Sequence, residues 1–195
     1  MLFRSIPPTE GKLTILGIDA VKNPLQVRNR IGVVLQQPSY EPTLSVEKSL
    51  DKYGMMWNVH KEIRQKRVEE LLEEFGLKEI RNKKNDDLSI GQRRRVQVAR
   101  EFMHDMELIF LDEPTVGLDP TARRKLLDFL KNKAKSGLTI FYTTHVLTEA
   151  EYICDEIAII NKGKIIAVDT TDDLKNRFGR EKRSEEHTSE LQSHV

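Results

Sequence analysis

The chain has 195 residues, of which 38% are hydrophobic and 32% charged, and its formal net charge is +1. This length supplies one globular domain with a sizeable core and room for an inserted lobe, and the near-neutral charge argues against a polyanion-binding protein. The single cysteine, Cys154, excludes an internal disulfide, and no apolar run approaches the ~18 residues of a membrane-spanning helix.

Both ends of the chain resemble foreign sequence. Residues 183–195 are similar to the translation of a common short-read library adaptor, and Leu2-Phe3-Arg4-Ser5 resembles the opposite adaptor. We therefore expect residues 1–5 and 183–195 to be adaptor-derived and disordered, and the natural sequence to be cut at both ends. The alternative is an ordinary start and an ordinary polar tail. Neither stretch has periodicity, so both are excluded from the fold prediction.

Two strands are predicted in the first part of the chain. Lys12 to Gly17 is typical of a short strand closed by glycine. Ile31 to Leu35 is a second, apolar strand, and it delivers Gln36 to its carboxyl end. The amide of Gln36 could reach a metal or a water, although a single glutamine in this position is more often an ordinary loop residue.

The sequence contains no phosphate-binding loop. Such a loop has the pattern G-x-x-x-x-G-K-[ST]. The Gly11-Lys12 pair does not fit, because Ile6 replaces the first glycine and Leu13 the hydroxyl residue, and no other position fits.

Three helices are predicted next. Ser45 to Asn58 begins with Ser45 as N-cap. His60 to Phe75 ends at Gly76, and a third helix runs from about Leu88 to His104. The apolar residues of the second helix recur at i, i+3, i+4 and i+7, at Val68, Leu71, Leu72 and Phe75.

The start of the third helix combines a capping box with a candidate anion site. Ser89 and Gln92 have capping-box spacing, which alone would explain both residues. The free amides of the first turn, the missing side chain at Gly91 and the helix dipole also favour an anion. Arg93-Arg94-Arg95 follows directly, and we expect at least two of these arginines to lie on a solvated face.

A strand ending in two acids follows. Leu108 to Leu111 is an apolar run typical of a parallel strand buried on both faces. It ends in Asp112 and Glu113, and Pro114 prevents the strand from continuing. Side chains alternate along a strand, so one acid can hold Mg²⁺ while the other faces an attacking water. The alternative is a buried strand followed by a solvated turn.

The last part of the chain presents a histidine at a strand end. Asp119-Pro120 predicts the N-cap and first residue of a helix. Leu138 to Thr144 is a strand that places His145 at its carboxyl end, where Asp112 and Gln36 would converge with it. A short helix, two strands and a final helix complete the chain, at residues 146–153, 156–161, 164–168 and near Asp172.

Together these residues resemble the nucleotide-binding domain of ATP-binding-cassette (ABC) proteins, over about Pro8 to Phe178. Six motifs carry the resemblance: Gln36 matches the Q-loop, residues 88–92 the signature motif, residues 108–112 Walker B, Glu113 the catalytic glutamate, residues 117–119 the D-loop and His145 the switch histidine. Ile90 departs from the signature, which usually has glycine there. Thr144-His145 with Glu149-Ala150-Glu151 resembles the single-domain ATPases of multidrug and ABC-2-type exporters.

The resemblance implies an α/β fold, a P-loop NTPase (RecA-like) core of ABC ATPase type with an inserted α-helical subdomain, missing its N-terminal strands. Residues 6–182 would form a partial ABC ATPase domain. Its core would comprise residues 6–38 and 106–182, and residues 39–105 would form the helical subdomain that carries the signature motif.

The resemblance also implies roles for the site residues in a dimer that sandwiches two Mg-ATP molecules. Glu113 would activate the attacking water, Asp112 and Gln36 would hold Mg²⁺, and His145 would stabilise charge on the phosphate in the transition state. The catalytic residues would therefore be Glu113, His145 and Gln36. Ser89, Gly91 and Gln92 would complete the partner's nucleotide site, next to Asp119 of the D-loop.

The implied function is the ATP-binding and hydrolysing subunit of an ABC transporter, which powers export through a separate transmembrane permease subunit. The protein would be cytoplasmic and peripheral on the inner face of the cell membrane, with no nucleic-acid partner. Without the Walker A loop, we expect the chain itself to be inactive.

Two alternatives remain at this stage. One is a non-transport ABC ATPase acting on ribosomes or nucleic acid, which only Arg93 to Arg95 and Lys83-Lys84 support. The other is a non-catalytic interaction module, against which the intact Asp112, Glu113 and His145 argue.

Overall fold

The computed structural model describes residues 8–37 and 39–177. The chain divides into two compact units, one ending at His145 and the other beginning at Val146. The predicted adaptor-derived ends, residues 1–5 and 183–195, lie outside the described residues. The division into a core and a helical subdomain remains a prediction.

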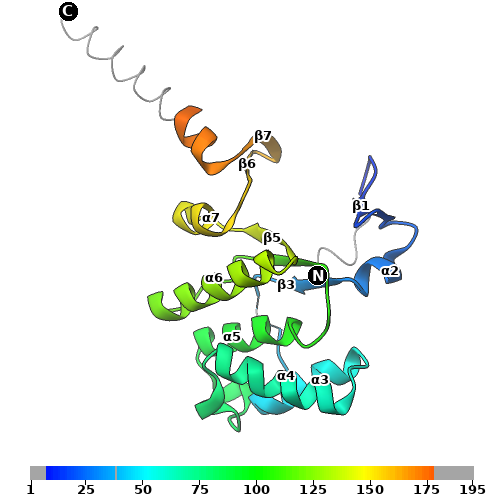
Figure 1. The fold of residues 1–195 in the computed structure, drawn as a ribbon, viewed down its shortest axis with the longest axis vertical. Helices are drawn as coiled ribbons and strands as arrows, with labels where there is room; N and C mark the ends of the chain where they lie inside the picture. Colours follow the sequence, from blue (N-terminus) through cyan, green and yellow to red (C-terminus); the bar gives the residue numbers. More distant parts are fainter. Residues whose placement is uncertain (1–7, 38, 178–195) are drawn as a thin grey trace, which may run out of the picture. The chain divides into compact units, whose positions relative to one another are not determined.

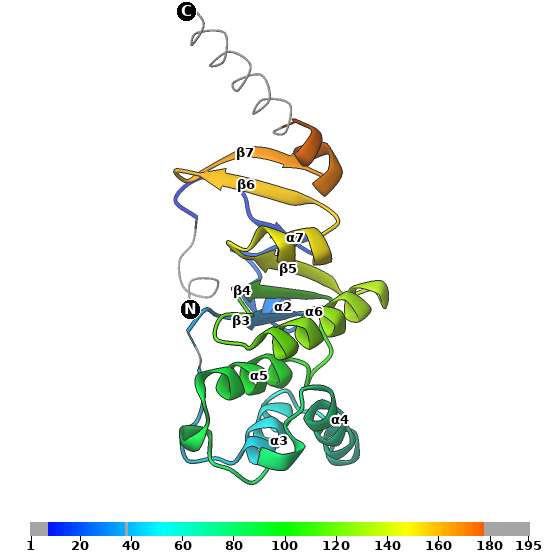
Figure 2. The same ribbon diagram turned by 90° about the vertical axis from the view of Figure 1, so that its left-hand side faces the viewer.

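A three-stranded parallel sheet forms the centre of the first unit (Figures 1 and 2). Its order is β3-β4-β5, and the strands are β3 (Ile31–Val34), β4 (Leu108–Asp112) and β5 (Thr139–Thr143). Val34 pairs with Leu111, and Asp112 pairs with Thr143. The carboxyl ends of all three strands therefore lie at one edge. The predicted apolar strands are confirmed to within a residue at each end.

Helix α6 (Pro120–Lys135) contacts β5 and buries Leu126, Leu127 and Leu130. Burial of each leucine contributes roughly 1.5–3 kcal/mol. Asp119 caps this helix as predicted, because its side chain accepts a hydrogen bond from the Ala122 amide at 2.9 Å. A second apolar cluster comprises Val27, Ile31, Leu108 and Phe110, with residues 15, 16, 18, 20 and 33 packed against it.

Three further helices of this unit pack below the sheet in the view of Figure 2. They are α3 (Val46–Met56), α4 (Lys61–Glu74) and α5 (Ile90–Glu101), with short 3-10 turns at Lys78–Ile80 and Asn85–Asp87. All three helices were predicted, although each is shorter than expected. Trp57, the C-cap of α3, stacks on His104 with ring centroids 4.0 Å apart and planes 9° from parallel.

The strand predicted over Lys12 to Gly17 is observed only at Thr14–Ile15, and its pairing with a second strand was not predicted. Residues 14–19 form a hairpin of two short strands, β1 (Thr14–Ile15) and β2 (Ile18–Asp19). Leu16 and Gly17 join them with φ of 51° and 77°, and positive φ at both central residues is what a tight hairpin turn requires. The short helix α2 (Pro24–Arg28), which follows, has no counterpart in the sequence prediction.

The second unit contains helix α7 (Leu147–Ile153) and an antiparallel pair, β6 (Ile157–Asn161) and β7 (Lys164–Asp169). Lys162 and Gly163 form the turn, again with positive φ. Residues 171–177 are helical, as predicted near Asp172. No helix in the described part of the chain has the length and apolar character needed to cross a bilayer.

Candidate functional site

Glu113 lies at the centre of a cluster built from all three strand ends. Its Oε2 accepts a hydrogen bond from Gln36 Nε2 at 3.1 Å, and its Oε1 lies 2.9 Å from His145 Nδ1. Gln36 follows β3, Glu113 follows β4 and His145 follows β5. The predicted meeting of Gln36 and His145 at this sheet edge is therefore observed, around Glu113.

Asp112 has a different partner. Its Oδ1 accepts a hydrogen bond from Thr143 Oγ1 at 2.6 Å, across the β4–β5 register. The two acids thus make separate contacts, as strand alternation predicts. The sequence prediction missed Thr143, whose hydroxyl orients the Asp112 carboxylate. Its position beside Asp112 could not be predicted, because the sequence does not show which residue of β5 pairs with Asp112 of β4.

The backbone of Glu113 is strained. Its φ is 45°, in the left-handed region that a residue with a side chain rarely adopts. Its amide still donates to the Thr143 carbonyl at 3.1 Å. Backbone strain of this kind occurs at functional sites where the surroundings determine the conformation. Here it turns the Glu113 side chain toward Gln36 and His145.

The same contacts keep the Glu113 carboxylate ionised. The hydrogen bond with His145 is the largest cause that holds the pKa of Glu113 below its usual value, and the hydrogen bond from Gln36 is the next. The side chain of Glu113 is 23% exposed, and that of His145 is 71% exposed. The cluster is therefore an ionised base that solvent can reach.

The expected solvated face at Arg93 to Arg95 is not observed. Arg94 is 1% exposed and bonds to main-chain carbonyls of two loops. Arg93 is half-buried beside the Tyr40 ring, and Arg95 is half-buried with its guanidinium on the carbonyls of residues 75 and 76. Helix periodicity could not show this, because the acceptors are distant in sequence.

The start of α5 forms the predicted capping box. The Ser89 amide donates to Gln92 Oε1 at 3.0 Å, and the Gln92 amide donates to Ser89 Oγ at 3.2 Å. A Cβ at Gly91 would lie 2.7 Å from the Gly117 carbonyl oxygen, so a side chain there would force the backbone apart. Ile90 is 63% exposed and packs against Gly117. Residues 89–92 therefore form a second cluster with Gly117 and Leu118.

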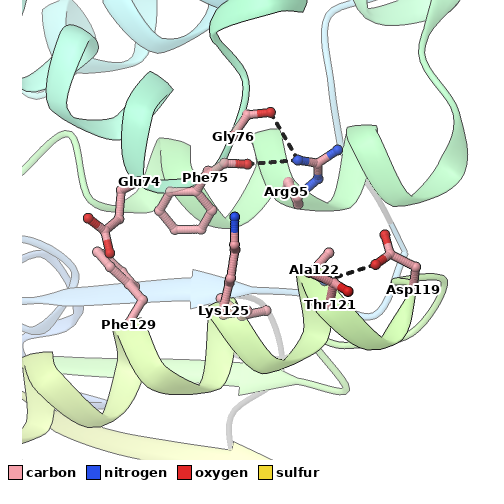
Figure 3. Close-up of a pocket in the computed structure, with 10 residues that line it drawn as sticks. Glu74, Phe75, Gly76, Arg95, Asp119, Thr121, Ala122, Lys125 and Phe129 are labelled. Carbon is pink, nitrogen blue, oxygen red and sulfur yellow. Dashed lines mark hydrogen bonds between the residues drawn. The ribbon is translucent and has the colours of Figure 1, made fainter.

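A small cleft lies beside this second cluster (Figure 3). Its volume is about 150 Å³, and α4, α5 and α6 contribute its lining. Arg95 Nη1 donates to the carbonyls of Phe75 and Gly76 at 2.8 and 3.0 Å, while Lys125 rises from α6 toward Phe75. The lining mixes acidic, basic and aromatic side chains, so charge alone does not select a ligand.

The residues at the sheet edge fit a magnesium ion bound together with a phosphate. Within residues 8–37 and 39–177, no three His, Cys, Asp or Glu side chains surround a common point. Magnesium commonly binds through one or two carboxylates and the substrate's phosphates. The Asp112 carboxylate and the Gln36 amide supply oxygen donors of the kind it prefers.

Polar residues at the carboxyl edge of a parallel sheet are the usual ligand-binding arrangement of open α/β domains. A family model described as "ABC transporter" matches residues 1–116. The chain belongs to the ABC transporter family, which confirms the resemblance seen in the sequence.

Two relatives illustrate the similarity. The linearmycin resistance ATP-binding protein LnrL of Bacillus subtilis (strain 168) is 36% identical over 92% of this chain and 58% of its own length. The doxorubicin resistance ATP-binding protein DrrA of Mycobacterium tuberculosis is 38% identical over 88% of this chain and 52% of its own. The chain thus spans slightly more than half the length of these relatives.

Solved structures show the same fold. An ATP-binding subunit of an ABC transporter superposes with a TM-score of 0.80 at 28% identity, covering 88% of this chain and 72% of that one. A dimeric ATP-binding cassette in a post-hydrolysis state, bound to ADP and phosphate, gives 0.77 at 26% identity, covering 86% and 76%. The fold is that of an ABC ATPase nucleotide-binding domain.

Proposed function

We propose that this chain is part of the ATP-binding and hydrolysing subunit of an ABC exporter. The observation that carries the proposal is the ionised Glu113 carboxylate, held between Gln36 and His145 at the edge of the parallel sheet. Export is supported by relatives named for linearmycin and doxorubicin resistance. On the same grounds we propose a permease partner and a location on the inner face of the membrane.

The proposed chemistry is hydrolysis of the γ-phosphate. The oxygen of a water attacks the γ-phosphorus, the bond to the ADP oxygen breaks, and Glu113 polarises the water or takes its proton. Gln36 fixes the Glu113 carboxylate from one side, and His145, which contacts the other carboxylate oxygen, would stabilise charge on the phosphate. A magnesium ion held by Asp112 and Gln36 would neutralise charge on the phosphates.

The second cluster fits a role in a dimer. Ser89, Gly91 and Gln92 present the first turn of α5, where backbone amides and the helix dipole favour an anion. We propose that this turn contacts the γ-phosphate bound to a partner subunit, with Asp119 at the same interface. A dimeric relative bound to ADP and phosphate supports this arrangement. Ile90, which is 63% exposed, would lie at that contact and reshape it.

The alternative function on ribosomes or nucleic acid has less support in the structure. It depended on Arg93 to Arg95 and on Lys83-Lys84. Arg94 is buried, whereas both lysines are exposed. Nucleic-acid binding uses exposed cations and weakens steeply with salt. Salt-sensitive binding to nucleic acid would therefore favour this alternative over transport.

The test compares Glu113→Gln with the unchanged residue in a protein that joins these residues to a phosphate-binding loop. Loss of the base is expected to lower turnover by about 10²- to 10⁴-fold while ATP still binds. Glu107→Gln is the matched control, because Glu107 is exposed, pairs with Arg30 and adjoins the opposite end of β4. Wild-type turnover in the Glu113→Gln protein would refute the proposal.

A further inference from the structure

Arg94 joins the main chains of two loops through one buried guanidinium. Nη1 donates to the carbonyls of Leu35 and Gln36 at 2.6 and 3.1 Å. Nη2 donates to the carbonyls of Asp112 and Glu113 at 2.7 and 2.6 Å. Nε donates to the Pro114 carbonyl at 3.1 Å. All three guanidinium nitrogens therefore bond to the main chain of these loops.

These two loops carry two residues of the Glu113 cluster. The Gln36 side chain reaches Glu113 at 3.1 Å, and this distance depends on the separation of the two main-chain segments. A guanidinium is planar and holds its donors in a fixed fork. Arg94 therefore fixes both the spacing and the relative orientation of the segments that carry Gln36 and Glu113.

Arg94 also secures the strained turn at Glu113. It binds the carbonyls on both sides of the residue whose φ is 45°, those of Asp112 and Glu113. A left-handed conformation at a residue with a side chain persists only where neighbouring groups determine it. The two Nη2 contacts supply that constraint from within the buried interior.

The clamp belongs to helix α5, whose first turn holds Ser89, Gly91 and Gln92. Gln97, one turn after Arg94, accepts from Arg94 Nη1 at 2.8 Å and donates to the carbonyls of Leu35 and Gln37, each at 3.2 Å. Helix, arginine and loops thus form one hydrogen-bonded assembly. A displacement of α5 would move Gln36 and Glu113 together.

We propose that Arg94 is a positioning residue that sets the geometry between Gln36 and Glu113 and couples it to helix α5. The part of this proposal that concerns turnover rests on the proposed ATPase function. The part that concerns the two loops rests on the geometry alone, so the two parts are tested separately.

The first experiment measures backbone ¹⁵N order parameters in the 195-residue chain. The Arg94→Lys variant keeps the positive charge but loses the planar guanidinium and its fixed set of donors. Order parameters are expected to fall at residues 35–37 and at 112–116 together, from rigid values near 0.85 toward about 0.6. The matched control is Arg95→Lys, which removes bonds only to Phe75 and Gly76 and should leave both loops unchanged.

Arg94→Gln is the second variant, because a neutral side chain avoids an unpaired buried charge. Hydrogen exchange of the β3, β4 and β5 amides serves as the reference for the fold. Loosening of both loops with an unchanged sheet supports the proposal. A change in neither loop, a change in only one, or equal loss throughout the sheet would overturn it.

The second experiment uses the protein that includes a phosphate-binding loop. Arg94→Lys is expected to lower kcat by about ten-fold or more, with KM for ATP within about two-fold, because misplacement affects the transition state more than binding. An unchanged kcat would overturn the proposal. If the loop-containing protein with Arg94 intact showed no Glu113-dependent turnover, the ATPase function would be refuted instead. The order parameters would still decide the role of Arg94 in the loops.

Discussion

At the level of single residues, the candidate site consists of three side chains that each follow a different strand: Glu113, with Gln36 and His145 on either side of its carboxylate. Glu113 gains its contacts only after the strands align, since Gln36 and His145 are far from it in sequence. Both contacts favour the ionised form. The pH at which this group takes up a proton therefore reports directly on the assembled site.

The pKa of Glu113 is expected to lie below 4.5, and His145→Ala or Gln36→Leu should raise it. A group whose pKa is depressed by folding contributes stability above its unfolded value. That contribution should be lost as the pH falls from about 4.5 through the folded-state pKa.

Carboxyl ¹³C titration of the 195-residue chain measures this value. His60→Ala is the control, because His60 is an exposed residue at the start of α4 and its side chain makes no capping bond. A wild-type midpoint at or above 4.5 would contradict the prediction.

Part of the candidate site could be predicted from the residue types in the sequence. Asp112, Glu113 and His145 follow apolar strands, and parallel strands bring such ends to one edge. The roles of Arg94 and Thr143 could not be predicted. Arg94 looked like part of a solvated run, since its acceptors are carbonyls that only the tertiary fold brings near. Thr143 depends on the register between β4 and β5.

At the scale of the elements, the start of α5 carries both a structural and a proposed functional role. Ser89→Ala removes half of the capping box and is expected to lower the free energy of unfolding by about 1 kcal/mol. Ser89→Asn keeps a capping acceptor and should lose much less. Chemical denaturation of both variants measures the difference, and equal losses would show that the cap is not the cause.

The long periodic elements and the short elements of the second unit were predicted well, whereas two short elements near the start of the chain were not. The three parallel strands and helices α3 to α6 have apolar patterns strong enough to place them within a few residues. The β1–β2 hairpin was not predicted, because its turn requires a positive φ at Leu16, a conformation that leucine rarely adopts. Helix α2 has only five residues and no side-chain cap, so it had neither periodicity nor a start signal beyond Pro24.

At the scale of the whole chain, the absence of G-x-x-x-x-G-K-[ST] from the 195 residues predicts weak nucleotide binding. The amides and lysine of that loop cradle the phosphates in P-loop NTPases. Calorimetric titration of the 195-residue chain with Mg-ATP should therefore give a Kd weaker than about 1 mM, or roughly −4 kcal/mol.

The control is a protein in which the same residues are joined to such a loop. This protein should bind Mg-ATP far more tightly. Micromolar binding by the 195-residue chain itself would show that its own residues hold the phosphates, and would remove the reason to expect inactivity.

The stacking of Trp57 on His104 gives the chain a built-in optical reporter. Trp57 is the only tryptophan in the sequence, so its emission comes from one known place. Its ring lies 4.0 Å from that of His104, which joins the end of α3 to the segment after α5. A change in emission intensity would therefore record separation of these two segments, without any attached dye and in the unmodified protein.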